Sequence, residues 1–335
     1  MNGEFHYYWT YILAVEAGLP AADAEILACA SQYPDENIDP VRVLTAKGAY
    51  DSIVTHHYGF WSETAHREVL VPFHFIPGDP AEAAAARTDH APGRWTVTPK
   101  SPIARRALIQ ALKTRSLYRI GIALHAYADT WAHQNFSGLR DPANQLPAGS
   151  LLPAIGHAQF RLKPDILEAR WEDPRLVPSL RRVDNRERFF AAAEMIFRYL
   201  CTFNHRDWDS WPLIRDRMER IIGPPGREKS PEERLLDYQI EYGAPPAVRS
   251  AWKSLALQTP AGASSRGADS DPRAAAVQEK LRWFRDELLE RSSLQKRAEA
   301  AAAPGFFDSH WYRWMEAARA HREEVQGLIA AGYGR

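Results

Sequence analysis

The sequence predicts an all-α fold, and three observations lead to this prediction. Apolar residues recur at helical spacing through most of the 335 residues. Proline, glycine and short polar clusters fall between these periodic segments, where they end one helix and begin the next. No segment alternates apolar and polar residues over a length that would indicate a strand. We therefore expect a multi-helix bundle.

In the first third of the chain, proline residues separate the apolar segments. Leu19-Pro20 divides two expected helices, and a loop is expected from Pro34 onward. The apolar run from Val69 to Pro77 contains two prolines, which favours a buried extended connection. The elements predicted here are helices at about 7–17 and 22–32, a short helix or irregular segment at 41–54, the extended connection at 69–77, and one or two helical turns at 80–87.

One long helix, from about Ile103 to Ala132, is expected in the middle of the chain. Ser101 and Pro102 stand where a hydroxyl caps a helix and where proline fits its first turn. The next segment is rich in Gly, Pro, Asn and Asp, which predicts a loop. The elements expected after the long helix are a loop at 138–156, a helix at about 156–162 and a helix at 186–204.

The last third begins at a break, Gly223-Pro224-Pro225-Gly226. We expect a helical domain over residues 1–222 and a C-terminal helical extension over residues 223–335 that packs on it. Charged residues dominate the final helices, so they predict a solvated hairpin that packs on the core or on another subunit. A homo-oligomer formed through these helices is therefore one alternative. The elements predicted are helical residues 231–258, a flexible linker at 259–272, and charged helices at 274–303 and 308–331.

Composition excludes several classes of protein. Lys+Arg and Asp+Glu both number 42, so the sequence carries no strong nucleic-acid signal. It contains neither a run of about 18 apolar residues, which a transmembrane helix needs, nor a secretory signal. The two cysteines, Cys29 and Cys201, lie in helical, apolar surroundings and are expected to be reduced. A cytoplasmic location is the expectation.

The strongest motif lies in the long helix, where His125, Asp129 and His133 are spaced by four residues. This spacing places three side chains along one helix face. Small and apolar residues surround them, so this face is expected to be buried. Burying two imidazoles and a carboxylate without partners is costly, and a divalent cation would satisfy all three. A hydrogen-bonded core network without metal is the alternative.

Further ligands must come from elsewhere, because one helix supplies too few for a closed site. Nine of the twelve histidines lie at or before position 157, so the site belongs to the first half. Three candidates have an alternative role that needs no metal. Asp35 and His157 could be surface residues, and His74 could be a hydrogen-bonded core residue. His56 could replace its neighbour His57. The candidate ligands outside the motif are His6, Asp35, His57, His74 and His157.

The order of these residues resembles the superfamily of zinc-dependent phospholipases C and fungal single-strand nucleases, which are all-helical proteins holding three zinc ions. An uncharacterised bacterial family related to it looks closer still. The resemblance covers about residues 5–200 and implies a helical bundle of that type, here with extra C-terminal helices. The stretches that carry it are Ala30–Asp35, Pro72–Pro77, His125–Gly138 and Gly156–Ala158.

The resemblance also implies an assignment of ligands. His133 and His157 would hold one metal, and His6 would serve another, with Asp129 bridging. The remaining metal would be held by Asp35, His57, His125 and Asp129. We therefore expect two or three divalent ions, most simply zinc, with iron or manganese as alternatives.

The chain departs from the superfamily in two places. The superfamily uses the amine and carbonyl of a mature N-terminal Trp as ligands, whereas Met1 lies five residues ahead of His6. Its last ligand follows the final histidine by four residues, where this chain has Arg161, and Asp165 is the expected substitute. A site with two metals is accordingly the simpler expectation.

Such a cluster suits hydrolysis of a phosphodiester or phosphomonoester by a metal-activated water. Asp165 or Asp35 is the candidate general base. Two alternatives remain open. One is an enzyme of other chemistry, such as amide hydrolysis or iron-dependent oxidation. The other is a non-catalytic helical binding protein whose metal is structural.

Overall fold

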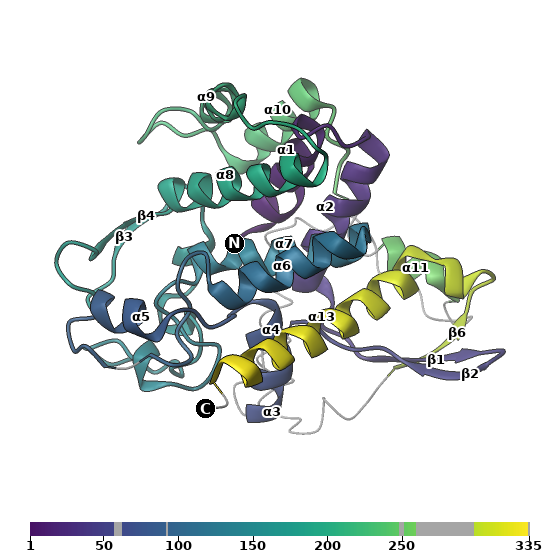
Figure 1. Ribbon diagram of the computed structural model, residues 1–335, viewed down its shortest axis with the longest axis horizontal. Helices are drawn as coiled ribbons and strands as arrows, with labels where there is room; N and C mark the ends of the chain where they lie inside the picture. Colours follow the sequence, from purple (N-terminus) through teal and green to yellow (C-terminus); the bar gives the residue numbers. More distant parts are fainter. Residues whose placement is uncertain (57–61, 92, 248–250, 259–297, 334–335) are drawn as a thin grey trace.

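A computed structural model describes residues 1–335 except 57–61, 92, 248–250, 259–297 and 334–335. The described residues form a mainly helical protein, as predicted (Figure 1). The helix α7 (Leu117–Ala132) lies at its centre and carries the histidine motif. The helices that pack on α7 are α2 (Ala21–Glu36), α6 (Pro102–Thr114), α8 (Asn185–Phe203) and α13 (His310–Tyr333).

The remaining helical segments are shorter. Two are π-helical, η1 (Glu4–Trp9) and η2 (His66–Leu70). Four are single 3-10 turns, η3 (Pro142–Asn144), η4 (Ala158–Phe160), η5 (Lys163–Asp165) and η7 (Phe306–Asp308). The α-helices among them are α1 (Thr10–Glu16), α3 (Glu63–Ala65), α4 (Val71–Phe73), α5 (Pro80–Ala86), α9 (Trp211–Ile222), α10 (Pro231–Tyr242) and α11 (Ala251–Ala256).

Close packing between α2 and α7 brings the two sides of the candidate site together. Every residue of α7 from Arg119 to Ala132 is buried. Gly121 makes the close approach possible, because a Cβ at this position would lie 2.6 Å from Cβ of Ala30 and 2.7 Å from the carbonyl oxygen of Leu27. The C-terminal end of α2 therefore lies against the polar face of α7.

The helix α2 continues through Pro34, where the sequence predicted a loop. Proline cannot donate the backbone hydrogen bond that the carbonyl of Ala30 would normally accept, which usually breaks a helix. Here the indole nitrogen of Trp314, on α13, donates to that carbonyl oxygen at 3.1 Å. The tertiary contact replaces the missing bond, so Asp35 lies on the last turn of a helix.

The helix predicted over residues 103–132 is wrong as a single element. Arg115 adopts a left-handed conformation, with φ 54°, and ends α6. Ser116 then caps α7 by accepting a hydrogen bond from the backbone nitrogen of Arg119. The chain turns at this point, so α6 packs beside α7.

Two small sheets depart from the all-α prediction. The first has the order β2-β1-β6-β5, with β1 parallel to β6 and the other neighbours antiparallel. It replaces the short helix or irregular segment predicted at 41–54, since Val41 and Val43 are buried and alternate with exposed residues. The second pairs β3 with β4. The strands are β1 (Val41–Thr45), β2 (Gly48–Asp51), β3 (Arg170–Glu172), β4 (Arg182–Asp184), β5 (Leu257–Gln258) and β6 (Ala298–Ala302).

Two further predictions are corrected near the candidate site. Residues 69–77 are buried as expected, but the chain is helical through Phe73 and becomes irregular only from His74 onward. The helix predicted at 156–162 is only the 3-10 turn η4, because Arg161 follows it with φ 57° and ends any helix. Asp165 thus reaches the site from the separate 3-10 turn η5.

The C-terminal part packs against the first part through β6, α10 and α13. Trp311, Trp314 and Met315 of α13 are fully buried, so this helix belongs to the core and is not mainly solvated. The helix α10 contacts η1. The predicted linker at 259–272 lies outside the described residues, as does most of the helix predicted at 274–303, whose described end, Ala298–Ala302, is a strand.

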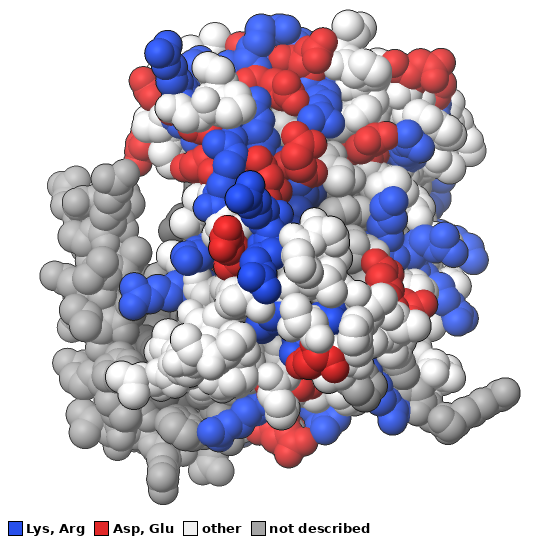
Figure 2. Space-filling view, turned by 90° about the vertical axis from the view of Figure 1, so that its left-hand side faces the viewer, with Lys and Arg blue, Asp and Glu red and all other residues white. Residues whose placement is uncertain are grey.

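Two surface properties bear on function. Basic and acidic side chains are interspersed on the face in Figure 2, so this face has no field of a single sign. Within the described residues, no helix combines the length and the apolar character needed to span a bilayer.

Both cysteines are free thiols, and Cys201 is buried.

Candidate metal centre

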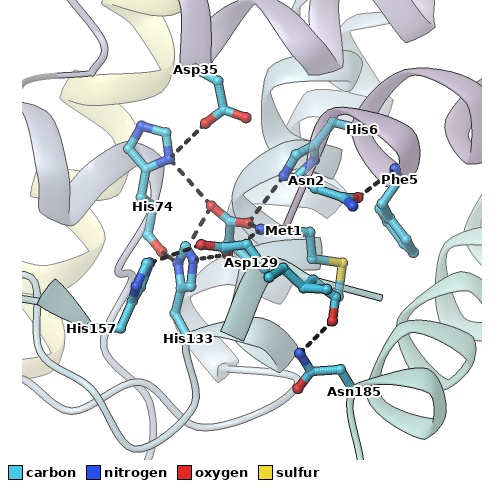
Figure 3. A network of polar contacts seen from close by, with 12 residues as sticks. Met1, Asn2, Phe5, His6, Asp35, His74, Asp129, His133, His157 and Asn185 are labelled. Atoms are coloured by element: carbon cyan, nitrogen blue, oxygen red, sulfur yellow. Dashed lines mark hydrogen bonds and ion pairs between the residues drawn. The ribbon is translucent and has the colours of Figure 1, made fainter. Parts of the chain in front are cut away.

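The carboxylate of Asp129 lies at the centre of a cluster of imidazoles near the C-terminal end of α7 (Figure 3). It is 1% exposed. Its Oδ1 lies 3.2 Å from Nε2 of His6. Its Oδ2 lies 3.2 Å from Nδ1 of His74, 3.4 Å from Nε2 of His125 and 3.6 Å from Nδ1 of His133. Four of the predicted ligands therefore meet at one carboxylate.

Three groups of side chains have donor atoms within 4.8 Å of one another. The inner group is His6, His125 and Asp129. The α2 group is Asp35, His74 and His125. The outer group is His133, His157 and Asp165. Asp129 touches residues of all three groups, so it could bridge ions held by them.

Backbone carbonyl oxygens fix the orientation of four imidazoles. A carbonyl only accepts, so each of these contacts places the proton on the ring nitrogen that makes it. The other ring nitrogen then carries a lone pair and faces the cluster. The four contacts are Nδ1 of His125 to Ser31 at 2.7 Å, Nδ1 of His133 to His74 at 2.8 Å, Nδ1 of His157 to Arg161 at 2.7 Å and Nε2 of His74 to Thr55 at 2.9 Å.

The resulting lone pairs point at one another. Nε2 of His125 lies 3.1 Å from Nδ1 of His74, and neither nitrogen carries a proton in the neutral rings. In the outer group, Asp165 places one oxygen 3.1 Å from Nε2 of His133 and the other 3.2 Å from Nε2 of His157. Such convergence of acceptors is satisfied only by protons or by a cation. Zinc takes the same combination of neutral imidazole and carboxylate.

The α-amino group of Met1 is also part of the cluster (Figure 3). It contacts Oδ1 of Asp129 and lies 3.4 Å from Oδ1 of Asp165. Burial alone would lower the pKa of this amine, but Asp129, Asp165 and Asp35 raise it to about 10. The amine is therefore a cation held between two carboxylates. We did not expect the amine there, because Met1 lies five positions ahead of His6 in the sequence.

The carboxylates differ in how their pKa responds to this environment. Burial would raise the pKa of Asp129, but His133, the Met1 amine and His125 lower it well below its usual value. Asp165 behaves in the same way, chiefly through His157 and the Met1 amine. Burial raises the pKa of Asp35 to about 7, and His74 only partly opposes this. Asp129 and Asp165 thus remain ionised at neutral pH, the form in which a carboxylate can bind a metal.

The imidazoles also differ. Burial, His125 and the Met1 amine lower the pKa of His6 well below its usual value. Burial likewise lowers the pKa of His157. Burial would lower the pKa of His133, but Asp129 and Asp165 together raise it above its usual value. Two of these rings are therefore held neutral, which is the form that binds a metal.

Of the predicted ligands, all but one lie in the cluster. His57 lies outside the described residues, so its role stays a prediction. Its neighbour His56 places Nδ1 3.3 Å from Nε2 of His74 and 3.9 Å from Asp35. His74, to which the resemblance gave no metal, stands with Asp35 and His125. Asp165 lies where a ligand following His157 was expected, at the end of the separate 3-10 turn η5 and not on an α-helix continuous with His157.

Solvent reaches some of the described residues of the cluster but not others. His6 and His125 are fully buried, whereas the side chains of Asp35, His157 and Asp165 are 26%, 18% and 17% exposed. An aromatic ring backs the outer group, since Phe75 stacks on His133 with the ring centroids 4.5 Å apart. The cluster is therefore closed toward the core and open at the α2 and outer groups.

Comparison with known proteins places the chain in a family. No curated protein and no solved structure matches it. A family model described as a family of unknown function, DUF6765, matches residues 1–329. Because the match spans nearly the whole chain, this protein belongs to the DUF6765 family.

Proposed function

We propose that this protein is a metal-dependent hydrolase that acts on a phosphoester and holds two or three divalent ions, zinc being the first candidate. The observation that carries the proposal is the pair of bare nitrogens of His74 and His125, 3.1 Å apart beside Asp129. Two lone pairs at this distance repel each other unless a cation or a proton lies between or beside them. The same donor set suits zinc and, less selectively, iron or manganese.

Each of the three groups would contribute ligands to a different metal ion. Asp129, with His6 and His125, would hold the most buried ion. His74, beside His125, and the outer group of His133, His157 and Asp165 would hold the ions nearer to solvent, and Asp35 would stay next to them without binding a metal. When bound, such ions neutralise a phosphoryl group and lower the pKa of a water molecule toward neutrality. No serine or cysteine nucleophile is required in this mechanism.

The protein's own residues supply orientation and a base. The carbonyls of Ser31 and Thr55 hold His125 and His74 in the required tautomer. Asp35 is the better candidate for the general base, because it is the most exposed carboxylate of the cluster. Asp165 is the better candidate for a ligand, because both of its oxygens face imidazoles. A base must lie within reach of the water that it deprotonates.

One observation bears on the non-catalytic alternative. The inner group is closed to solvent, as a structural metal site would be. The partial exposure of the α2 and outer groups favours a catalytic site, which needs an open position. Amide hydrolysis and iron-dependent oxidation would use the same donors, so the choice among reactions rests on the substrate test.

The test is turnover of the zinc-loaded protein on 4-nitrophenyl phosphate, bis(4-nitrophenyl) phosphate and a 4-nitroanilide. We expect hydrolysis of at least one phosphoester, loss of turnover on chelation and recovery with zinc. Asp35→Asn should lower kcat by about 100-fold or more, as the loss of a general base does. Asp39→Asn is the matched control, because Asp39 lies four residues further along the chain, beyond the end of α2, and is exposed. Turnover of the anilide alone would contradict the proposed reaction.

A further inference from the structure

A cavity of about 230 Å³ lies on a different face of α2 from the metal centre. The residues of α2 that line it recur every three or four positions, and they therefore share one face of the helix. Ser31 and Asp35, which face the metal centre, belong to another face. The lining residues of α2 are Glu25, Cys29, Gln32, Tyr33 and Glu36.

Aromatic rings from the C-terminal part form one wall of this cavity. Trp252 of α11 stacks on His310 of α13, with the ring centroids 5.2 Å apart and the planes within 13°. Tyr33 lies against Trp252, with the centroids 6.2 Å apart. The hydroxyl of Tyr118 lies 2.7 Å from Nδ1 of His310 and fixes the orientation of that ring. The faces of such rings attract cations.

The charge of the cavity has one sign. Glu25 and Glu36 line it, and no Lys or Arg stands among its described lining residues. Glu25 is exposed at the rim, and no ion pair joins it to another described residue. Burial, then Glu25 and Glu36, raise the pKa of the Cys29 thiol to about 12, so the floor of the cavity is neutral. A carboxylate beside an aromatic wall complements an organic cation.

We propose that this cavity binds a small organic ammonium ion, with its apolar body against Tyr33 and Trp252 and its charged nitrogen near Glu25. The volume is below the range typical of drug-sized ligands, which limits the body to about the size of one six-membered ring. The proposal is independent of the metal centre, which uses the other face of α2.

The test compares two probes of one shape. Cyclohexylammonium carries the charge at pH 7, and cyclohexanol has the same ring without it. Calorimetric titration of the full-length protein should show cyclohexylammonium binding at least tenfold more tightly. Glu25→Gln should weaken cyclohexylammonium by roughly three- to tenfold and leave cyclohexanol unchanged. Trp252→Leu should weaken both probes, because it removes the wall.

Glu323→Gln is the control, because it removes an exposed carboxylate from α13 outside the cavity. Thermal unfolding of each variant shows whether it folds, and Glu25→Gln alters a rim residue that is expected to leave folding intact. Equal affinity for the two probes, or equal loss of binding in Glu25→Gln and Glu323→Gln, would overturn the proposal. Failure of both probes to bind the wild-type protein at millimolar concentration would overturn it as well.

Discussion

The inner and outer groups of the candidate centre are built in different ways. The inner group comes from two helices, η1 and α7, and is fully enclosed by the core. The outer group comes from the C-terminal end of α7 and from the irregular chain that follows, and solvent reaches it. Helices fix positions through packing, whereas a loop needs anchors of its own. We therefore expect different substitutions to disturb the two groups.

A buried ion pair anchors the inner group. Arg234 of α10 binds both oxygens of Glu4 with two hydrogen bonds of 2.8 and 2.7 Å, and both side chains are almost fully buried. The hydroxyl of Tyr238 donates to the same carboxylate at 2.9 Å. Glu4 opens the π-helical turn that carries His6. The C-terminal part thus holds the N-terminal ligands in place.

Another buried ion pair anchors the loop of the outer group. Arg175 and Asp173 are each 1% exposed and pair at 2.6 Å. The guanidinium of Arg175 also lies over the rings of Phe136 and Phe160, at 4.1 and 4.6 Å from their centroids. Phe160 belongs to the turn that follows His157. Within the described residues, no hydrogen bond or ion pair joins this anchor to that of Glu4, so the two groups can be perturbed separately.

The largest effect is expected for Asp129→Asn. This residue contacts both groups, and the amide would replace a bridging charge with a neutral group of the same shape. We expect loss of metal from both groups, measured as metal equivalents per chain by elemental analysis. Retention of the full wild-type content would show that Asp129 does not join the groups.

Arg234→Met is expected to weaken the inner group and to destabilise the fold. It leaves the carboxylate of Glu4 buried without its ion pair, which costs roughly 3–5 kcal/mol of unfolding free energy. Denaturation by urea measures this loss. The double variant Glu4→Gln/Arg234→Met should recover part of it, because no unpaired charge remains. A double variant as unstable as the single one would refute this account of the anchor.

Asp165→Asn is expected to affect the outer group alone. Both oxygens of Asp165 face imidazoles of that group, so its loss should remove one metal equivalent and leave the rest bound. Unfolding free energy of the metal-free protein should fall as well, because His157 and the Met1 amine stabilise this carboxylate in the folded state. Equal loss of metal from both groups would mean that they are one site.

The smallest effect is expected for Arg42→Ala. Arg42 pairs with Asp51 across the β1–β2 hairpin, but both side chains are largely exposed, and such pairs add little to stability. Metal content and thermal unfolding should match those of the wild type. A change in metal content would show that the sheet influences the centre.

Sequence reasoning found the part of the centre that helical spacing dictates. His125, Asp129 and His133 needed only the period of an α-helix, and the order of residues added His6, Asp35 and His157. It could not place His74 with Asp35 and His125, because that contact depends on how α2 packs on α7. Nor could it foresee that Trp314 would let α2 continue through Pro34. Tertiary contacts of this kind leave no local signal.

The small sheets were missed for a related reason. Strand β1 pairs with β6, which lies more than 250 residues away in the chain, so the local run from Val41 to Thr45 was too short to decide its structure. Arg115 and Arg161 end helices with positive φ, a conformation that few non-glycine residues adopt and that sequence patterns do not predict.

The most direct test is diffraction from crystals grown with zinc, recorded above and below the zinc absorption edge. We predict anomalous peaks within bonding distance of Asp129 and His125, and of His133, His157 and Asp165. Chelation should remove the peaks while the helices remain. A well-ordered structure without such peaks, with protonated imidazoles bonded directly to the carboxylates, would contradict the account.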